Sequence, residues 1–501
     1  MHGQEPFTGR ELLLVVLVVV VFMCLGLVAI ADGSPLGHDE SVYALRAEYV
    51  ATGAEHGLYW ADYRAPGLPF LLAPMWAVRF TEPYLRLVVL GFGVAGVVAS
   101  WLVARRLFGP IIGLLTAALL ALSPGWLDSS VAVWPDVPGA ALGLWAVAIF
   151  ATSIDAERIR TWALTAAPIA VAATVIRYGA PIPIGLALSI LGLWAWRQVR
   201  RSPVVVGTVA LATAVGCGIV LLVPSVTGAE TPPLVSINKL QQASAYPFGR
   251  TFLDFGRQLP GVLGPVVGLS VVIGWLLALR AVLRGAVSQR ALGAVFAATV
   301  LIGLGLAFSL RHGEPRYLMP VVPFLLMGAA AGLGSMAEVL KGAITASIGL
   351  LAAAAATAAS LNVALASNEV RSEWFSVIKQ AARELGANAT RPCVVITSYS
   401  PQVAWYSDCA VTTFPAGEGE IGRQLPRQPS TGELMARVDE FPPPTTVYML
   451  IAKGGKRQPT GPVLEASVDS AQERVLTVGD PEAANLRHVE VYLMRAPARP
   501  S

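Results

Sequence analysis

Charged residues are scarce in this chain. Asp, Glu, Lys and Arg make up 14% of its 501 residues, hydrophobic residues make up 55%, and the mean hydropathy is +0.62. Soluble globular domains carry about 25% charged residues, so this composition excludes an ordinary soluble protein. It predicts a polytopic α-helical membrane protein. The net charge of +4 is small and lies in short loops, where it bears on membrane topology rather than on binding of nucleic acid.

Residues that hold metals or nucleotides are also few. The five histidines and four cysteines are scattered, and their spacings do not predict a metal site. The sequence has no glycine fingerprint of a nucleotide-binding turn, and Gly454-Gly455-Lys456 is better interpreted as a hairpin turn. We therefore predict no cofactor, although a divalent cation held by Asp39 and Asp136 would be compatible with the sequence.

Long uncharged runs predict about eleven transmembrane helices. About 20 apolar residues cross a bilayer core, and the first such run, which has no clear cleavage site, is interpreted as a retained helix. With the N-terminus in the cytoplasm, arginines gather at four places on the inner side, which is the positive-inside pattern. The pair 161–176 and 179–196 could also be a differently broken hairpin. The predicted spans are 12–31, 85–104, 110–127, 137–152, 161–176, 179–196, 204–224, 261–279, 291–310, 317–334 and 342–365.

Four polar motifs fall at span ends on the predicted outer side. Charged groups at membrane depth are costly, so they usually face a cavity, pair with one another or take part in chemistry. Each motif alone could be a helix-end anchor whose side chain reaches the interface. Their shared side favours one site. The motifs are Asp39-Glu40, Trp134-Pro135-Asp136, Arg177-Tyr178-Gly179 and the segment from Arg311 to Tyr317.

The first outer segment, 32–84, is longer than a connector requires. Apolar residues at helical spacing between Ser41 and Tyr59 predict a helix along the membrane surface. A turn with two prolines follows, and the apolar run 68–80 is too short to span, so it should lie in the interface or re-enter it. The second long outer loop, 225–260, is interpreted either as a lid or as an unstructured connector.

The composition changes sharply after residue 365. Residues 1–365 are predicted to form the transmembrane domain, and 366–501 an α/β domain outside the cell that caps the acceptor side. A helix should begin near Ser367 and end at Gly386. Cys393 and Cys409 begin successive strands, so adjacent parallel strands would permit a disulfide between them, as suits an oxidising exterior. The strand-like runs are 393–398, 409–413, 446–452, 474–478 and 488–494.

In their order along the chain, these motifs resemble those of a known class of enzymes. Asp39-Glu40 and Tyr43 follow the first helix, and the outer loop carries Tyr63-Arg64-Ala65-Pro66-Gly67. Asp136 lies in the next outer loop, and Glu314-Pro315-Arg316-Tyr317-Leu318 comes late. The set is similar to the GT-C glycosyltransferases, in particular to the branch of the protein O-mannosyltransferases and the lipid A aminoarabinose transferase, of family 39 and 83 type. The resemblance covers residues 10–365. The chain differs from the aminoarabinose transferases at the place in the first outer loop where those enzymes have a Lys-Pro-Pro element.

The resemblance implies transfer of a sugar, with inversion, from a polyprenyl-phosphate donor to a cell-envelope acceptor at the outer face of the plasma membrane. A neutral acceptor hydroxyl needs a carboxylate to take its proton, and we select Asp39 as this base. Asp136 would be the second carboxylate, which positions the acceptor or the sugar. The leaving lipid phosphate needs cationic donors, among which Arg316 is preferred. The candidate substrate-binding residues are Glu40, Tyr43, Arg64, Arg177, Tyr178, His312, Glu314, Arg316 and Tyr317.

Simpler roles and other functions stay open on the sequence alone. Glu40 could cap the helix that follows it, Arg316 could only pair with Glu314, and His312 could be a structural residue at the interface. A lipid-linked sugar flippase would also have many spans, although it should show internal repeats and charges near the middle of the membrane. An envelope-assembly protein would use the helices only to anchor its outer domain.

Overall fold

The computed structural model describes residues 7–54, 62–78, 81–243, 250–285, 287–310, 313–337, 358, 362, 375–397, 399–412, 438–439, 441, 444–453, 473–479 and 488–495. The chain forms two compact units. The helical unit comprises Met1–Asp32, Asp62–Leu68 and Arg86–Ala366, and the sheet unit comprises Gly33–Ala61, Pro69–Leu85 and Ser367–Ser501. Most of the first outer segment therefore groups with the C-terminal residues.

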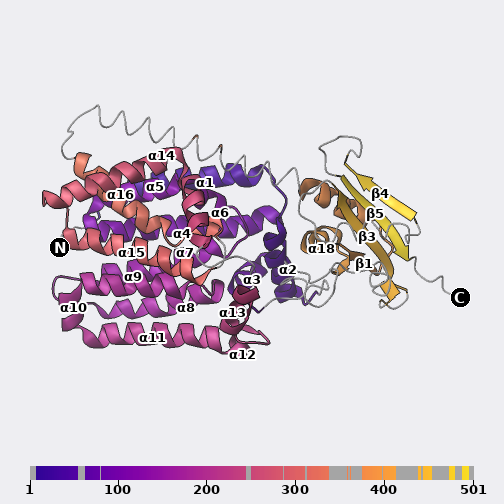
Figure 1. Ribbon diagram of the computed structural model, residues 1–501, viewed down its shortest axis with the longest axis horizontal. Coiled ribbons are helices and arrows are strands. Elements are labelled where there is room, and N and C mark those ends of the chain that lie inside the picture. The colour runs from indigo at the N-terminus through magenta and orange to yellow at the C-terminus, as the bar shows by residue number, and fades with distance from the viewer. Residues whose placement is uncertain are drawn as a thin grey trace. The chain divides into compact units, whose positions relative to one another are not determined.

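Apolar helices make up the helical unit (Figure 1). Six described helices are long and apolar enough to cross a membrane: α1 (Gly9–Ala31), α4 (Glu82–Phe108), α7 (Asp136–Ser153), α11 (Pro203–Leu222), α14 (Arg250–Leu283) and α15 (Gln289–Ser309). A seventh candidate is the pair α5 (Pro110–Ala121) and α6 (Pro124–Ser130), which is bent by 64°. The shorter helices are η2 (Thr161–Thr165), α8 (Ala166–Ile176), α9 (Pro181–Trp194), α10 (Trp196–Arg201), α12 (Pro224–Thr227), α13 (Pro233–Ala243), η3 (Pro315–Leu318) and α16 (Val322–Ala337).

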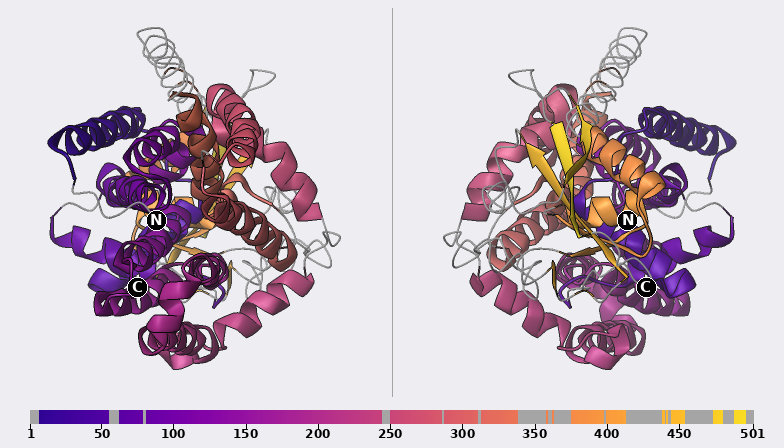
Figure 2. Two further views of the ribbon diagram at one scale, coloured as in Figure 1. Left: turned by 90° about the vertical axis from the view of Figure 1, so that its left-hand side faces the viewer. Right: turned by 90° about the vertical axis from the view of Figure 1, so that its right-hand side faces the viewer.

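The predicted spans agree with these helices over most of the chain. Each span from 12–31 to 317–334 overlaps a described apolar helix. The regions 161–176 and 179–196 form separate helices, α8 and α9, and α8 packs against α7 and α11 (Figures 1 and 2). The last predicted span, 342–365, lies almost wholly outside the described residues. The chain is thus a multi-pass helical membrane protein, and the count of eleven spans stays a prediction.

Small residues let the long helices of this unit approach closely. A Cβ atom at Gly274 of α14 or at Gly332 of α16 would overlap the backbone of the other helix. Backbones can come this close only where side chains are absent, which is how helices commonly pack in membranes. Bulky residues such as Phe22, Trp126 and Ile302 then fill the remaining core and are fully buried.

Helix α14 is interrupted near its middle. Gly264 has φ +71° and ψ 167° and lies next to Pro265, so the α-helix cannot continue through it. The hydroxyl of Ser123 donates to the carbonyl of Val262 at 2.9 Å, which satisfies an acceptor at the break. The predicted span 261–279 lies mainly in the part of α14 that follows this break, and residues 250–260, which were predicted to be a loop, form its first part.

The sheet unit contains a five-stranded mixed sheet with the strand order β2-β1-β3-β5-β4. Strands β1, β2 and β3 run parallel, whereas β5 is antiparallel to both β3 and β4. The strands are β1 (Cys393–Ile396), β2 (Ala410–Thr412), β3 (Thr446–Lys453), β4 (Glu473–Val478) and β5 (His488–Arg495). The helices are α2 (His38–Thr52), η1 (Ala73–Ala77), the helical residues 375–388 and α18 (Ser400–Ser407), while α3 (Gly67–Leu72) begins in the helical unit.

Side chains alternate between the two faces of this sheet, as expected for strands buried on both sides. Val395 of β1 and Leu450 of β3 face the helical residues 375–388 and α18, which lie together on one side in Figure 2. Met449 and Ile451 face the opposite side. Cys393 and Cys409 are joined by a disulfide with a Cα–Cα distance of 5.2 Å, because parallel pairing of β1 and β2 brings the strand starts together.

Two predicted helix ends differ from the structure. The C-terminal helix continues past Gly386 to residue 388, and a Cβ at Gly386 would overlap the backbone of Ser407. This glycine permits close packing against α18 rather than ending the helix. Helix α2 ends at Thr52, because Gly53 adopts φ +75° at its C-cap, and Leu45 of α2 packs in the core of the sheet unit.

Candidate functional site

Polar residues of the helical unit gather where three helices begin or end. Asp136 is the first residue of α7, Arg177 is the C-cap of α8, and Glu314 precedes η3. We call Trp134, Asp136, Arg177, Glu314, Arg316 and Tyr317 the arginine–tyrosine cluster. The prediction that motifs far apart in sequence meet is thus realised for three segments of this unit.

An ion pair between Asp136 and Arg177 lies at the centre of the cluster. The Asp136 side chain is 2% exposed and that of Arg177 18% exposed. The N-terminus of α7 favours a negative charge at Asp136, and the arginine neutralises it. Gly139 lies one turn further along α7, where a Cβ would come within 2.9 Å of the Cβ of Arg177. The sequence therefore leaves space for the arginine beside the helix.

Tyr317 connects this ion pair to a second arginine. The guanidinium carbons of Arg177 and Arg316 lie 5.0 and 5.5 Å from the centroid of the Tyr317 ring, and that of Arg316 is 4.8 Å from the Trp134 ring. These are cation–π distances. Arg316 Nε also contacts Glu314 Oε2 at 2.7 Å. The Tyr317 phenol carries an O–H group that can donate a hydrogen bond.

Helix α14 holds the segment that carries Glu314 and Arg316. The Thr251 hydroxyl donates to the Leu310 carbonyl at 2.7 Å, the Gly313 amide donates to Asp254 Oδ2 at 3.1 Å, and the Gln258 amide donates to the Gly313 carbonyl at 2.9 Å. The three side chains lie on one face of α14, at intervals of three and four residues. These three residues were not predicted to be part of the site, because residues 225–260 were interpreted as a loop. The spacing Thr-x-x-Asp-x-x-x-Gln was the available signal.

The first outer loop is tied to the helical unit at residues 62–67. The Asp62 carboxylate accepts hydrogen bonds from the Glu230 amide at 3.1 Å and the Thr231 amide at 2.9 Å. A Cβ at Gly67 would come within 2.8 Å of the Val175 backbone, so this glycine allows the loop to approach the end of α8.

Within this loop Arg64 is buried, and its guanidinium carbon lies 5.5 Å from the Tyr63 ring. Ala65 shares a small hydrophobic cluster with Tyr178 and Val220. The structure thus brings the Arg64 segment to the Arg177-Tyr178 segment.

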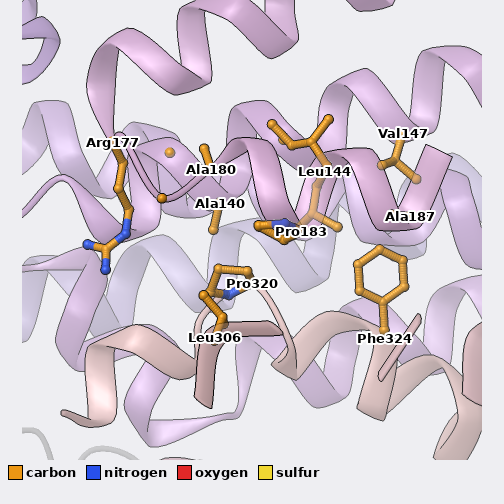
Figure 3. A pocket seen from close by; sticks show the side chains of 14 residues that line it. Ala140, Leu144, Val147, Arg177, Ala180, Pro183, Ala187, Leu306, Pro320 and Phe324 are labelled. Atoms are coloured by element: carbon orange, nitrogen blue, oxygen red, sulfur yellow. The ribbon is translucent and has the colours of Figure 1, made fainter. Parts of the chain in front are cut away.

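A narrow groove extends from Arg177 between α7 and α9 (Figure 3). Apart from Arg177 its lining is apolar, and the arginine lies at the end opposite Val147, Ala187 and Phe324. The space not filled by protein atoms is about 440 Å³, counting the open mouth. Gly139 and Gly143 form part of the wall on α7, and the other lining residues are Ala140, Leu144, Gly179, Ala180, Pro183, Ile184, Leu306 and Pro320. An apolar chain with an anionic end would match this lining.

Asp39, Glu40 and Tyr43 belong to the sheet unit, in the first two turns of α2. Asp39 is half-buried, whereas Glu40 and Tyr43 are buried. Glu40 Oε2 accepts a hydrogen bond from the Gly37 amide at 2.8 Å and so caps the start of α2. Arg311 and His312 lie outside the described residues. Within the part of the chain that the structure describes, no three His, Cys, Asp or Glu side chains gather to hold a metal ion.

Two family models match parts of the chain that contain these segments. The model described as dolichyl-phosphate-mannose-protein mannosyltransferase matches residues 63–220, and that of the Alg9-like mannosyltransferase family matches residues 253–403. The first range contains Arg64, Asp136 and Arg177, and the second contains Arg316 together with Asp254 and Gln258 of α14. No curated protein sequence matches the chain.

Solved structures of similar architecture cover nearly the whole chain. ArnT from Cupriavidus metallidurans in the apo state matches with a TM-score of 0.69 and 16% identity, over 97% of this chain and 99% of ArnT. The same protein bound to undecaprenyl phosphate matches with a TM-score of 0.69 and 16% identity, over 95% of this chain and 97% of ArnT. The apo oligosaccharyltransferase from Archaeoglobus fulgidus matches with a TM-score of 0.60 and 12% identity, over 88% of this chain and 69% of that protein.

These likenesses establish the fold, and the two family models both describe mannosyltransferases. The resemblance inferred from the sequence motifs is confirmed. The chain is a glycosyltransferase with the GT-C fold.

Proposed function

We propose that this glycosyltransferase moves a sugar from a polyprenyl-phosphate donor to a hydroxyl of a cell-envelope glycan, lipid or protein, at the outer face of the membrane and with inversion. The observation that carries the proposal is the apolar groove that ends at Arg177. It suits a lipid chain with a phosphate at its head, and ArnT of similar fold has been solved with undecaprenyl phosphate bound.

Arg177 and Arg316 are the proposed ligands of the donor phosphate. Both guanidinium groups lie within cation–π distance of the Tyr317 ring, so they are held close to one another before any substrate arrives. Guanidinium groups bind phosphate oxygens in a bidentate manner, and they would stabilise the charge that the phosphate gains as the glycosidic bond breaks. The Tyr317 phenol can add a further donor.

The carboxylates have separate proposed roles. The acceptor oxygen attacks the anomeric carbon, the bond from that carbon to the phosphate oxygen breaks, and the lipid phosphate leaves with the bonding electrons. Asp39 would accept the proton of the acceptor hydroxyl. Asp136 is engaged by Arg177, so we assign it to holding that guanidinium and to positioning substrate rather than to proton transfer.

The remaining candidates take supporting roles in this proposal. Arg64 and Tyr178 belong to segments that pack together beside Arg177, and they would contact the sugar or the phosphate. Glu314 holds Arg316, and His312 stays a prediction. Glu40 fixes the start of α2 through the Gly37 amide, and Tyr43 lies one turn further along the same helix.

Transfer can be tested with purified protein in lipid nanodiscs. Undecaprenyl phosphate carrying radiolabelled mannose or aminoarabinose would be supplied together with an envelope fraction, and the release of undecaprenyl phosphate would be measured. We expect transfer that is lost in Arg177→Ala, and NMR of the product should show an inverted anomeric centre. If label crosses the bilayer of proteoliposomes without leaving its carrier, a flippase is the correct function. If label neither moves nor transfers with any donor, an assembly role is favoured.

A further inference from the structure

The chain entering the helix of Asp39 is held by residues of the C-terminal α/β domain. The Leu36 amide donates a hydrogen bond to the Tyr406 hydroxyl at 2.8 Å. The side-chain amide of Gln402 is oriented so that both its oxygen and its nitrogen form hydrogen bonds. In this orientation the backbone amide of His38 donates to the Gln402 side-chain oxygen at 3.1 Å. Both acceptors lie on α18, more than 360 residues away in sequence. His38 is the first residue of α2, so its amide has no partner within the helix and needs such an acceptor.

The backbone amide of Gly37, between Leu36 and His38, also has a hydrogen-bond acceptor. Gly37 donates to Glu40 Oε2 at 2.8 Å. Three consecutive backbone donors therefore end on three side chains directly before Asp39, the second residue of α2. The Gln402 side chain is 1% exposed and its nitrogen donates to the Tyr399 carbonyl at 3.2 Å, which fixes its oxygen toward α2.

Further contacts bind the same region to the domain. Leu45 of α2 is buried in one hydrophobic core with Ile378 and Val403. Lys379 Nζ lies 5.2 Å from the Tyr406 ring and forms an ion pair with Glu82 at 3.1 Å. A shift of α18 would therefore carry the start of α2 with it.

We propose that Tyr406 and Gln402 are positioning residues for Asp39, and that the α/β domain thereby controls the chemical step. This inference rests on the proposed role of Asp39 as the base. A base must lie within hydrogen-bond reach of the proton that it accepts, and a displacement of about 1 Å can reduce the rate by about 100-fold. Loss of either acceptor would leave an amide without its partner and would let the first turn of α2 rearrange.

The test uses the full-length protein and compares two tyrosines of the same domain. Tyr406→Phe removes the acceptor of the Leu36 amide and keeps the ring. Tyr448→Phe is the matched control, because the Tyr448 hydroxyl accepts from the Thr390 amide at 3.2 Å and that bond does not involve α2. We expect Tyr406→Phe and Gln402→Ala to reduce kcat by about 5- to 20-fold, with the donor KM within about 2-fold of wild type. Tyr448→Phe should keep both values, with a similar change in Tm.

A double-mutant cycle separates positioning from a general loss of stability. Asp39→Asn should retain a low single-turnover rate. If Tyr406 acts through Asp39, the double variant Asp39→Asn/Tyr406→Phe should have the same rate as Asp39→Asn alone. The inference is overturned if Tyr406→Phe lowers that residual rate by the same factor as in wild type, or if it behaves like Tyr448→Phe. Full activity of Asp39→Asn would remove the base and this inference together, whereas absence of sugar transfer by the wild-type protein would contradict the proposed function itself.

Discussion

Gly139 offers a sharp test of the donor site, because one added methyl group should displace Arg177. In Gly139→Ala the new Cβ would lie 2.9 Å from the Cβ of Arg177, which is closer than two carbon atoms pack. The neighbour is held next to the backbone at the end of α8, so it cannot rotate away as the tip of a long side chain could. The end of α8 must therefore move, and the Asp136–Arg177 pair with it.

The expected magnitude follows from two opposing effects. Overpacking a filled site costs about 1 to 3 kcal/mol, and the upper part of that range, about 2 to 3 kcal/mol, applies here because the clashing atom is a Cβ fixed to the backbone. Replacing glycine by alanine in a helix stabilises it by about 1 kcal/mol. A net cost of about 1 to 2 kcal/mol at the phosphate ligand corresponds to roughly a 5- to 30-fold lower kcat/KM for the donor, since 1.4 kcal/mol equals a factor of ten. The global Tm should change little.

Gly185→Ala on α9 is the matched control, because a Cβ at that position meets nothing within 4 Å. It makes the same chemical change in a neighbouring helix, so it should keep wild-type kcat/KM. Both variants would be assayed for donor-dependent transfer and for thermal unfolding in nanodiscs. If Gly139→Ala keeps the wild-type kcat/KM for the donor, donor binding does not depend on the observed position of Arg177, and the assignment of Arg177 to the donor phosphate is refuted.

Three other outcomes are expected. Asp39→Asn keeps the shape of the side chain but cannot accept a proton, so turnover should fall by about 100-fold or more while donor binding persists. Glu40→Gln should reduce turnover less. Full turnover of the Asp39→Asn variant would exclude Asp39 as the base. Arg316→Lys keeps the charge and loses the planar fork, so donor binding should weaken without misfolding; unchanged donor kinetics would leave the arginine a purely structural role. Reduction of the Cys393–Cys409 disulfide should destabilise the α/β domain by about 3 kcal/mol. In intact cells, a thiol-reactive label should modify these two cysteines only after reduction. If labelling also requires permeabilised cells, the domain lies on the cytoplasmic side.

The dependence of α2 on α18 changes the expected role of the C-terminal domain. On sequence grounds the domain only covers the acceptor side. In the structure, Tyr406 and Gln402 bind the backbone that leads to Asp39. Under the proposed role of Asp39 as the base, the domain would act on catalysis without supplying a group that touches substrate.

The sequence by itself determined the membrane class, most helices and the strands. These features depend on short windows of residues. They are uncharged runs long enough to cross a bilayer, and short apolar runs such as 446–452, which is observed as the strand Thr446–Lys453. It also placed Asp136, Arg177 and Arg316 at helix ends, because polar residues that interrupt apolar runs must lie near the membrane surface.

Only the tertiary structure decided which of these residues meet. The pairing of Asp136 with Arg177 depends on how α7 packs against α8, and no local pattern encodes that register. Residues 250–260 seemed to be a loop because their charges lower the local hydropathy, yet in the folded chain Asp254 is the acceptor that holds Gly313. Gly386 likewise seemed to be a helix stop, but it is small because Ser407 approaches it. Contacts between distant segments are set by packing and by the need of buried polar groups for partners, and both become visible only when the chain is folded.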